Sequence, residues 1–270
     1  MQIIKNIFDL NKAIKNFHNF GFVPTMGGIH EGHISLIKKS QNRCDKTIVS
    51  IFINPKQFND KKDYVNYPKN LNKDIKILKK IKVDFLFLPS ESEIYKKNFR
   101  PIIINKSDKI LCAKHRKGHF EGVLNVMNRL LYIIKAKYIF MGEKDFQQLY
   151  LIKKYLSKKY NVKIINCKTI RDKNYVALST RNERLNRNNY LKLVNIVNEF
   201  RILKKNLILN KLFLKINLKK KIKEIEKFHK IKLDYLEIRE EKKLKIPKSN
   251  KKLRLFVAFW INKIRLIDNY

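Results

Sequence analysis

The sequence predicts an α/β protein: a domain with a mostly parallel sheet, followed by a smaller α+β domain. Strand-like and helix-like segments alternate through the first two-thirds of the chain, which is typical of βαβ units around a parallel sheet. After about residue 175 this alternation gives way to two lysine-rich helices and then two strands. The length of 270 residues suits one large or two modest domains, since a domain averages about 150 residues.

The elements of the first domain are predicted from its hydrophobic pattern. The segment 47–53 reads TIVSIFI, an uncharged run rich in β-branched residues, as in a buried strand. The segment 119–134 instead repeats its apolar residues at helical spacing. By the same criteria we expect strands at 21–24, 47–53, 83–88, 138–141 and 162–165, and helices at 34–41, 69–81, 119–134 and 145–158.

The second domain is expected to start after a polar stretch at 171–175. The pattern that follows predicts helices at 186–206 and 211–228 and strands at 233–238 and 253–260. The chain shows no internal repeat. We therefore expect one domain over residues 1–173 and a second over residues 174–270.

The chain is strongly basic, with 62 Lys and Arg residues against 23 Asp and Glu and a formal net charge of +39. Lysine-rich surfaces can bind nucleic acid by neutralising phosphates and releasing counterions. Lysine, isoleucine and asparagine recur in every kind of segment here, however, and arginine, the better reader of bases, is scarce beside lysine. Compositional drift is therefore favoured over specific nucleic-acid binding, which stays open as an alternative.

Several other classes of protein are excluded. Cys44, Cys112 and Cys167 are widely spaced and form no CxxC pair, which disfavours a disulfide scaffold or a structural zinc site. No segment has the roughly 18 uncharged apolar residues that a membrane span needs. Charged residues interrupt the apolar N-terminal segment, unlike a secretory signal. We expect a cytoplasmic protein without a membrane partner.

Three polar clusters follow directly on predicted strands: PTMGGIHEGH (24–33), NPKQF (54–58) and GEKDFQQ (142–148). In an open parallel sheet, the carboxyl ends of the strands line one crevice where ligands bind. The three clusters are therefore expected to meet in one site.

The first cluster carries the sharpest signal. Gly27, Gly28 and Gly32 would let the backbone approach a ligand closely, and His30 and His33 would share one face of a helical first turn. A helix N-terminus favours a phosphate group. The histidines are too close for the HExxH metal motif, and His33 stands where a P-loop needs lysine, so both motifs are rejected. A plain helix cap with two surface histidines is the alternative.

The other candidates are single residues in loops. Lys144 could hold a phosphate, Gln57 and the pair Gln147–Gln148 could bind hydroxyl or carboxylate groups, and Ser179-Thr180-Arg181 could close over a phosphate. Arg116 and His119 precede a long helix. A solvated lysine, an exposed polar loop, a helix cap and an ordinary N-terminal loop are the respective alternatives.

Together these residues resemble a known family. FVPTMGGIHEGHISLIKKS resembles the nucleotide-binding signature of the pantothenate synthetase (pantoate–β-alanine ligase) family, within the HxGH nucleotidyltransferase group. The resemblance continues in order through VSIFINPKQF, YPKNLNKD, RKGHFEGV, FMGEKDFQQL, ALSTRN, DYLEI and KIRLIDN. It implies a Rossmann-like domain with a smaller C-terminal lid domain, assembled as a homodimer.

The resemblance also implies a reaction in two steps. The carboxylate of (R)-pantoate attacks the α-phosphorus of ATP, supplied with Mg²⁺, and pantoyl adenylate and pyrophosphate form. The amine of β-alanine then displaces AMP to give pantothenate, the coenzyme A precursor. No protein ligand to the metal is assigned, and no specific nucleic-acid partner is expected.

Site residues carry over by matching motif positions. His33 would be the proton donor, with His30, Lys144 and Arg181 the other catalytic groups. Gln57 would contact both pantoate and β-alanine, and Gln148 would bind pantoate. ATP would be held by Met26, Gly27, Gly28, Ile29, His30, Glu31, Gly32, His33, Gly142, Glu143, Lys144, Asp145, Ile170, Leu178, Ser179, Thr180 and Arg181.

The chain departs from the family pattern at a few positions. Asn174-Tyr175 stand where Asp-Gly is common, and Gly28, Lys117 and Thr180 also differ. Two other functions remain open: a different HxGH nucleotidyl enzyme that leaves the adenylyl group on its product, and a basic RNA-binding module.

Overall fold

The structure, a computed structural model, describes residues 1–59, 61–95, 100–209, 217–247 and 252–270. It divides into two compact units, Met1–Ile170 and Arg171–Tyr270. The first unit thus ends at residue 170, three residues before the predicted boundary at 173. Each unit is described by itself.

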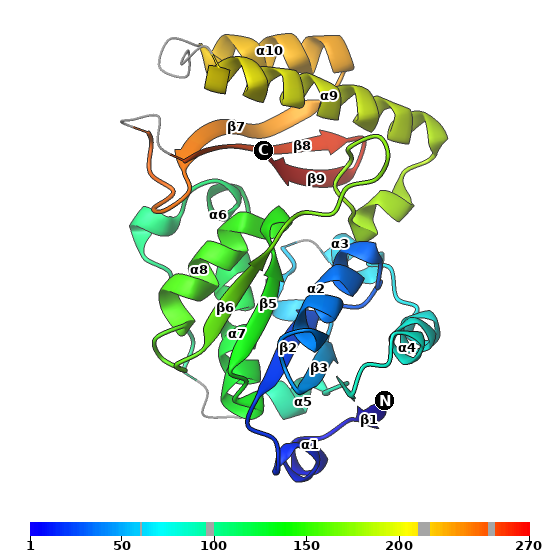
Figure 1. The fold of residues 1–270 in the computed structure, drawn as a ribbon. Helices are drawn as coiled ribbons and strands as arrows, with labels where there is room; N and C mark the ends of the chain where they lie inside the picture. Colours follow the sequence, from blue (N-terminus) through cyan, green and yellow to red (C-terminus); the bar gives the residue numbers. More distant parts are fainter. Residues whose placement is uncertain (60, 96–99, 210–216, 248–251) are drawn as a thin grey trace. The chain divides into compact units, whose positions relative to one another are not determined.

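The first unit is built on a sheet in which all the pairings among described residues are parallel (Figure 1). The strand order is β1-β4-β3-β2-β5-β6. The strands are β1 (Gln2–Ile4), β2 (Phe20–Thr25), β3 (Lys46–Ile51), β4 (Phe85–Phe87), β5 (Tyr138–Gly142) and β6 (Lys163–Cys167). The predicted Rossmann-like α/β fold is confirmed.

Helices connect and cover these strands. Helix α2 packs against β2, β3 and β5, while α8 packs against β5 and α7 (Figure 1). The helical segments are α1 (Ile7–Ile14), α2 (Glu31–Gln41), η1 (Pro55–Gln57), α3 (Lys61–Val65), α4 (Leu71–Lys80), α5 (Glu91–Ile94), η2 (Lys106–Asp108), α6 (Cys112–His115), α7 (His119–Ile134), η3 (Glu143–Asp145) and α8 (Phe146–Leu156).

The strand order reverses between β2 and β5. From β2 the chain moves outward through β3 and β4 on one side, and then returns to add β5 and β6 on the other side. Such a reversal leaves a crevice at the carboxyl ends of the two inner strands, because the following connections diverge. The position of a ligand site in this unit is therefore set by topology.

The core explains why the sheet strands are so apolar. Phe22, Val23, Ile48, Val49 and Phe140 are all fully buried. A parallel sheet with helices on its faces buries both sides of each strand, so apolar residues follow one another instead of alternating with polar ones.

The second unit is a small α+β domain, as predicted. An antiparallel sheet in the order β7-β8-β9 packs against two long helices (Figure 1). Phe200 of α9 meets Phe259 of β8 with ring centroids 5.7 Å apart. The elements are η4 (Thr180–Arg184), α9 (Arg187–Leu209), α10 (Leu218–His229), β7 (Lys232–Glu240), β8 (Leu253–Ile261) and β9 (Ile264–Asn269).

Several elements differ from their predicted bounds. Strand β1, helix α1 and strand β9 were not expected, and β3 ends two residues early because Asn54 starts the turn η1. Helix α10 begins at Leu218, where the Asn217 side chain accepts a hydrogen bond from the Lys220 N–H. The predicted start of that helix at 211 falls in 210–216, outside the described residues.

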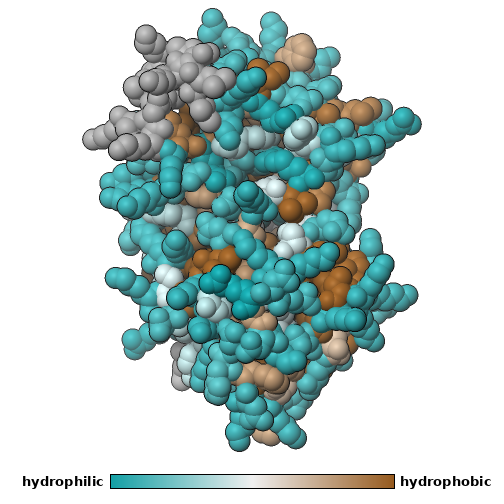
Figure 2. Space-filling model, viewed as in Figure 1, coloured by the Kyte–Doolittle hydropathy of each residue, from teal (hydrophilic) through white to brown (hydrophobic). Residues whose placement is uncertain are grey.

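Hydrophilic residues cover most of the face seen in Figure 2, and the apolar areas on it are small and separate. Within the described ranges, no helix combines the length and the apolar character needed to cross a membrane.

Candidate active site

The structure brings the three polar clusters of the first unit together. Thr25, the last residue of β2, pairs with Ile51, the last residue of β3, so the segments after them leave the same edge of the sheet. Across this edge, the Gln57 amide nitrogen lies 2.6 Å from the Met26 sulfur. In the third cluster, which follows β5, the charges of Lys144 and Asp145 act on His30 of the first cluster.

Two left-handed glycines shape the loop that follows β2. Gly27 has φ +83° and Gly28 has φ +62°, a region that favours glycine because it has no side chain. The Gly27 N–H donates to the Thr25 hydroxyl at 3.2 Å, and the N–H groups of Gly28 and Ile29 donate to the Asp74 carboxylate. These amides therefore bind protein oxygens.

The two histidines cap the helix that follows. His30 is the N-cap of α2, and its Nδ1 accepts the Gly32 N–H at 3.0 Å. The Nδ1 of His33 accepts the N–H of His30 at 3.4 Å, and the two rings lie 4.2 Å apart. Because each Nδ1 is an acceptor, the proton of each neutral ring is on Nε2. The helix cap that was the alternative interpretation is therefore present, and both histidines form it.

Both histidines are neutral at pH 7. Burial, followed by the charge of Lys144, lowers the pKa of His30 to about 4. The pKa of His33 falls to about 3, through burial first and then through the charges of His30 and Lys144. In the absence of a ligand, the rings can therefore donate an Nε2–H hydrogen bond, but they carry no positive charge.

Removing the charge of Lys144 should raise the pKa of both histidines. In Lys144→Met we expect both pKa values to rise but to stay below 6.5, because burial is the larger cause. The Cε1–H resonances of the rings, followed by NMR through a pH titration, would measure this. Lys79→Met removes the same charge from the last turn of α4 and should leave both values unchanged. Unchanged values in Lys144→Met would contradict the proximity.

Gln57 is held by a buried polar scaffold. The Asn54 side chain donates to Gln57 Oε1 at 3.3 Å and to the Gly122 carbonyl at 3.1 Å. His119 Nδ1 donates to the Gln57 carbonyl at 2.7 Å, so its Nε2 accepts from Arg116, 2.8 Å away. Arg116 and His119, left open by the sequence, thus fix the backbone of Gln57.

Gly122 allows this scaffold to form, and Gly122→Ala should disturb it. A Cβ there would lie 2.3 Å from the Lys56 carbonyl oxygen and 2.8 Å from the Gln57 Cα. We expect a loss of about 1–3 kcal/mol in the free energy of unfolding, measured by urea denaturation. Gly142→Ala is the matched control for stability, since a Cβ at Gly142 meets nothing within 4 Å. Equal stability of the two variants would contradict the close approach.

The remaining predicted residues of the first unit lie near the same edge or at its end. Gln148 is half-buried in the first turn of α8, directly after Gly142–Asp145. Its neighbour Gln147 is buried, donates to the Ile110 carbonyl at 2.7 Å and leaves its Oε1 buried without a hydrogen-bond partner. Ile170 is half-buried and is the last residue of the unit.

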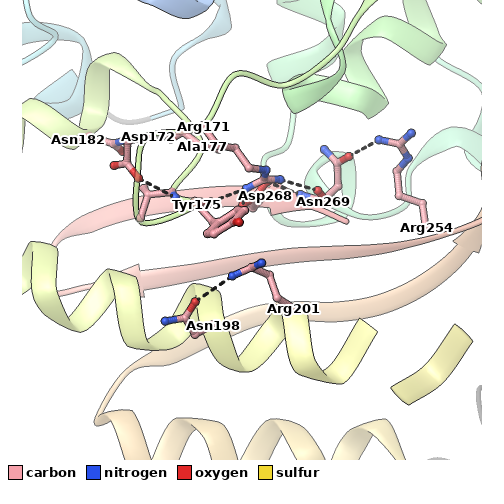
Figure 3. Close-up of polar contacts among 11 residues, drawn as sticks. Arg171, Asp172, Tyr175, Ala177, Asn182, Asn198, Arg201, Arg254, Asp268 and Asn269 are labelled. Carbon is pink, nitrogen blue, oxygen red and sulfur yellow. Dashed lines mark hydrogen bonds and ion pairs between the residues drawn. The ribbon is translucent and has the colours of Figure 1, made fainter. Parts of the chain in front are cut away.

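The predicted phosphate-closing segment Leu178–Arg181 belongs to the second unit. Ser179 caps η4 by accepting the Arg181 N–H at 3.3 Å, and Thr180 is buried. Asn182 donates to the Ala177 carbonyl at 3.0 Å (Figure 3). The segment therefore starts from a well-defined helix cap.

The turn before this segment is anchored to the sheet of the same unit. Arg171 donates to both carboxylate oxygens of Asp268, at 2.7 and 2.9 Å, and to the Tyr175 carbonyl at 3.0 Å (Figure 3). Tyr175 has φ +63°, and the Arg201 guanidinium lies 3.5 Å from the centre of its ring. This left-handed backbone conformation favours glycine over a residue with a side chain.

The comparisons with known proteins agree along the whole chain. The family model described as pantoate-beta-alanine ligase matches residues 2–270. The chain belongs to the pantoate–β-alanine ligase family. Pantothenate synthetase from Pseudothermotoga lettingae is 37% identical over 284 residues, covering 100% of this chain and 98% of that protein. The enzyme from Endomicrobium trichonymphae is 41% identical over 277 residues, covering 100% and 97%.

Solved structures of the family share the fold. The pantoate–β-alanine ligase of Francisella tularensis, crystallised with beta-gamma ATP and β-alanine, is 39% identical and superimposes with a TM-score of 0.85, covering 100% of this chain and 97% of its own. Pantothenate synthetase from Thermus thermophilus is 27% identical, covers 100% and 99%, and has the same TM-score. The resemblance inferred from the motifs is confirmed.

Some residues of the site were missed by sequence reasoning. Asp74, Asn54 and Gly122 each hold a predicted residue in place, but none was given a role. Asp74 closes the motif YPKNLNKD and Asn54 opens NPKQF, so both stood inside segments that already carried the resemblance. Their roles depend on partners more than 40 residues away in sequence.

Proposed function

We propose that the chain condenses (R)-pantoate with β-alanine in two steps at the edge of the first sheet. A pantoate carboxylate oxygen attacks the α-phosphorus of MgATP, and pyrophosphate leaves. The β-alanine amine then attacks the acyl carbon of pantoyl adenylate, loses a proton and expels AMP. Pantothenate, AMP and pyrophosphate are the products, and holding adenylate and amine together makes the second step effectively intramolecular.

The observation that carries this proposal is the pairing of functional groups across the reversal of strand order. His30 and His33 follow β2, and Lys144 follows β5, the next strand across the reversal. The charge of Lys144 acts on both rings, which places all three groups in one electrostatic environment. Donors and a cation gathered at this point favour an anion as the ligand.

The histidines and Lys144 are proposed to stabilise the charge that develops on the phosphates. In each ring a backbone N–H donates to Nδ1, which polarises the ring and strengthens the Nε2–H as a donor. The negative charge of a triphosphate would raise the pKa of both rings, so a proton on His33 is a consequence of binding. Lys144 would compensate the charge of the departing pyrophosphate.

The amide groups are proposed to bind the two organic substrates. Gln57 would contact pantoate and β-alanine, and Gln148 would contact pantoate, since a neutral amide can bind hydroxyl or carboxylate without a buried charge. The scaffold of Asn54, Arg116 and His119 supports this role, because it fixes the position of Gln57.

Other features of the function also remain proposals. The roles of Ile170 and Leu178–Arg181 in ATP binding rest on the resemblance alone. We also propose a homodimer in the cytoplasm that takes its metal ion as part of MgATP. The odd number and wide spacing of the cysteines support a reducing compartment, and sedimentation analysis would test the dimer.

The proposed function is tested by leaving out each substrate in turn. AMP and pantothenate should form only when pantoate, β-alanine and MgATP are all present. Pantoate and MgATP without β-alanine should support exchange of labelled pyrophosphate into ATP. ADP as the nucleotide product would contradict the adenylate route. An adenylylated final product would instead indicate a different nucleotidyl transfer. Tight RNA binding that persists at physiological salt would support the alternative of an RNA-binding module.

A further inference from the structure

A buried carboxylate from a distant helix holds the loop that follows β2. Asp74 lies in the first turn of α4 with only 2% of its surface exposed. Its Oδ2 accepts the Gly28 N–H at 2.9 Å, and its Oδ1 accepts the Ile29 N–H at 2.8 Å. Both oxygens of one side chain thus bind two consecutive amides that are more than 40 residues away in sequence.

The loop needs such a support because it has no regular structure of its own. Gly27 and Gly28 are both left-handed and leave this stretch with wide conformational freedom. A Cβ on Gly27 would lie 2.9 Å from Asp74 Oδ2, so the backbone and the carboxylate are packed closely together. The carboxylate therefore fixes the direction in which the chain enters His30, the N-cap of α2.

We infer that Asp74 is a positioning residue of the ATP-binding loop. Its carboxylate, and not a phosphate, binds the Gly28 and Ile29 amides, and it thereby holds the two imidazoles in position for the triphosphate. This inference rests on the proposed function. A buried carboxylate is stable only with strong donors, and two charge-assisted hydrogen bonds provide them. Asp74 would thus act on the substrate through the loop that it holds.

Asparagine is the most informative replacement for Asp74. It keeps the shape of the side chain, but it turns one acceptor into an N–H₂ donor that faces a backbone N–H. In Asp74→Asn we expect the KM for ATP to rise about tenfold, and the rate of pantoate-dependent exchange to fall by up to about 10²-fold, as for a displaced catalytic group. The KM for β-alanine, measured with preformed pantoyl adenylate, should stay within twofold.

Asp84 provides a matched control. Its Oδ2 accepts the Thr47 N–H at 2.9 Å and its Oδ1 pairs with Lys46 at 3.0 Å, so it also joins a carboxylate to a backbone amide. It directly precedes β4 and binds the first residues of β3, so it lies at the amino ends of two parallel strands, the edge of the sheet opposite the proposed site. Asp84→Asn should lower the thermal midpoint without changing the KM for ATP. An equal rise of that KM in both variants would reduce Asp74 to a general structural role and overturn the inference.

Amide hydrogen exchange tests the inference without any activity. In the unliganded wild-type protein, the Gly28 and Ile29 amides should be protected from exchange, and in Asp74→Asn this protection should be lost while the amides of β2 stay protected. Unprotected amides in the wild type would overturn the inference even if Asp74→Asn failed to fold. Asp74→Ser, which keeps one acceptor, should lose ATP affinity to an intermediate degree.

Two further outcomes separate this inference from its alternatives. Inactive wild-type protein in the substrate-omission assay, with both amides protected, would reject the proposed function but leave the loop support in place. Recovery of ATP affinity in Asp74→Asn at high Mg²⁺ would assign the carboxylate to the metal ion and overturn the inference. Failure to recover at any Mg²⁺ concentration is the expected result.

Discussion

Replacing His33 with alanine is expected to lower pantoate-dependent ATP–pyrophosphate exchange by about 10²–10³-fold, the effect of removing one preorganised donor from a developing charge. The variant should fold, because His33 is half-buried and lies on the first turn of α2, outside the fully buried core of the sheet. Exchange of labelled pyrophosphate into ATP, measured without β-alanine, isolates the adenylate step from the second step.

The matched control for this prediction is His18→Ala. His18 lies between α1 and β2, before the amino end of that strand, and so at the opposite edge of the sheet from His33. It should keep the exchange rate of the wild type. His33→Gln, which retains an N–H₂ donor, should lose less activity than His33→Ala. Exchange within twofold of wild type in folded His33→Ala would remove this histidine from the mechanism.

Asp268→Ala should cause a large loss of stability, confined to the second unit. The Asp268 side chain is 5% exposed and the Arg171 side chain 21% exposed, and two hydrogen bonds join them. Removing the carboxylate leaves a largely buried cation without its counterion, which costs about 3 kcal/mol where backbone carbonyls still accept from the cation. Here the carbonyls of Tyr175 and Asn269 remain.

Hydrogen exchange of the β8 and β9 amides would follow this loss, because it reports on the second unit separately from the first. Glu224→Ala is the control within the same unit: Glu224 pairs with Lys221 at 3.4 Å but is 50% exposed, and such a surface pair contributes less than about 1 kcal/mol. The double replacement Arg171→Met with Asp268→Leu should recover much of the stability, since no unpaired charge is left. Equal exchange rates in Asp268→Ala and Glu224→Ala would refute the prediction.

Much of the fold could be predicted because its elements are long and strongly patterned. Helix α7 has the predicted bounds, 119–134, since its apolar residues repeat at helical spacing over four turns. Strand β1 and helix α1 were not predicted, for two different reasons. Three residues are too few to show a period, and the α1 segment was read only for its charged interruptions.

The candidate site was predictable as a set of residues but not as a hydrogen-bonding arrangement. The sequence predicted the histidines and Lys144 at one sheet edge, and in the structure the charge of Lys144 acts on both rings. From the sequence, the backbone N–H groups at the start of α2 were expected to bind phosphate. In the structure, the N–H groups of Gly32 and His30 instead donate to imidazole nitrogens. Side chains that compete for backbone donors leave no periodic trace, so only coordinates reveal them.

The backbone of Tyr175 makes two positions of the second unit interdependent. A left-handed conformation costs a residue with a side chain about 1–2 kcal/mol, and the contact of its ring with the Arg201 guanidinium offsets roughly 0.5–1 kcal/mol of that. Glycine at 175 would relax the backbone yet leave Arg201 without its aromatic neighbour, so its benefit depends on which residue occupies position 201. Such epistasis constrains the order in which substitutions at these two sites can accumulate.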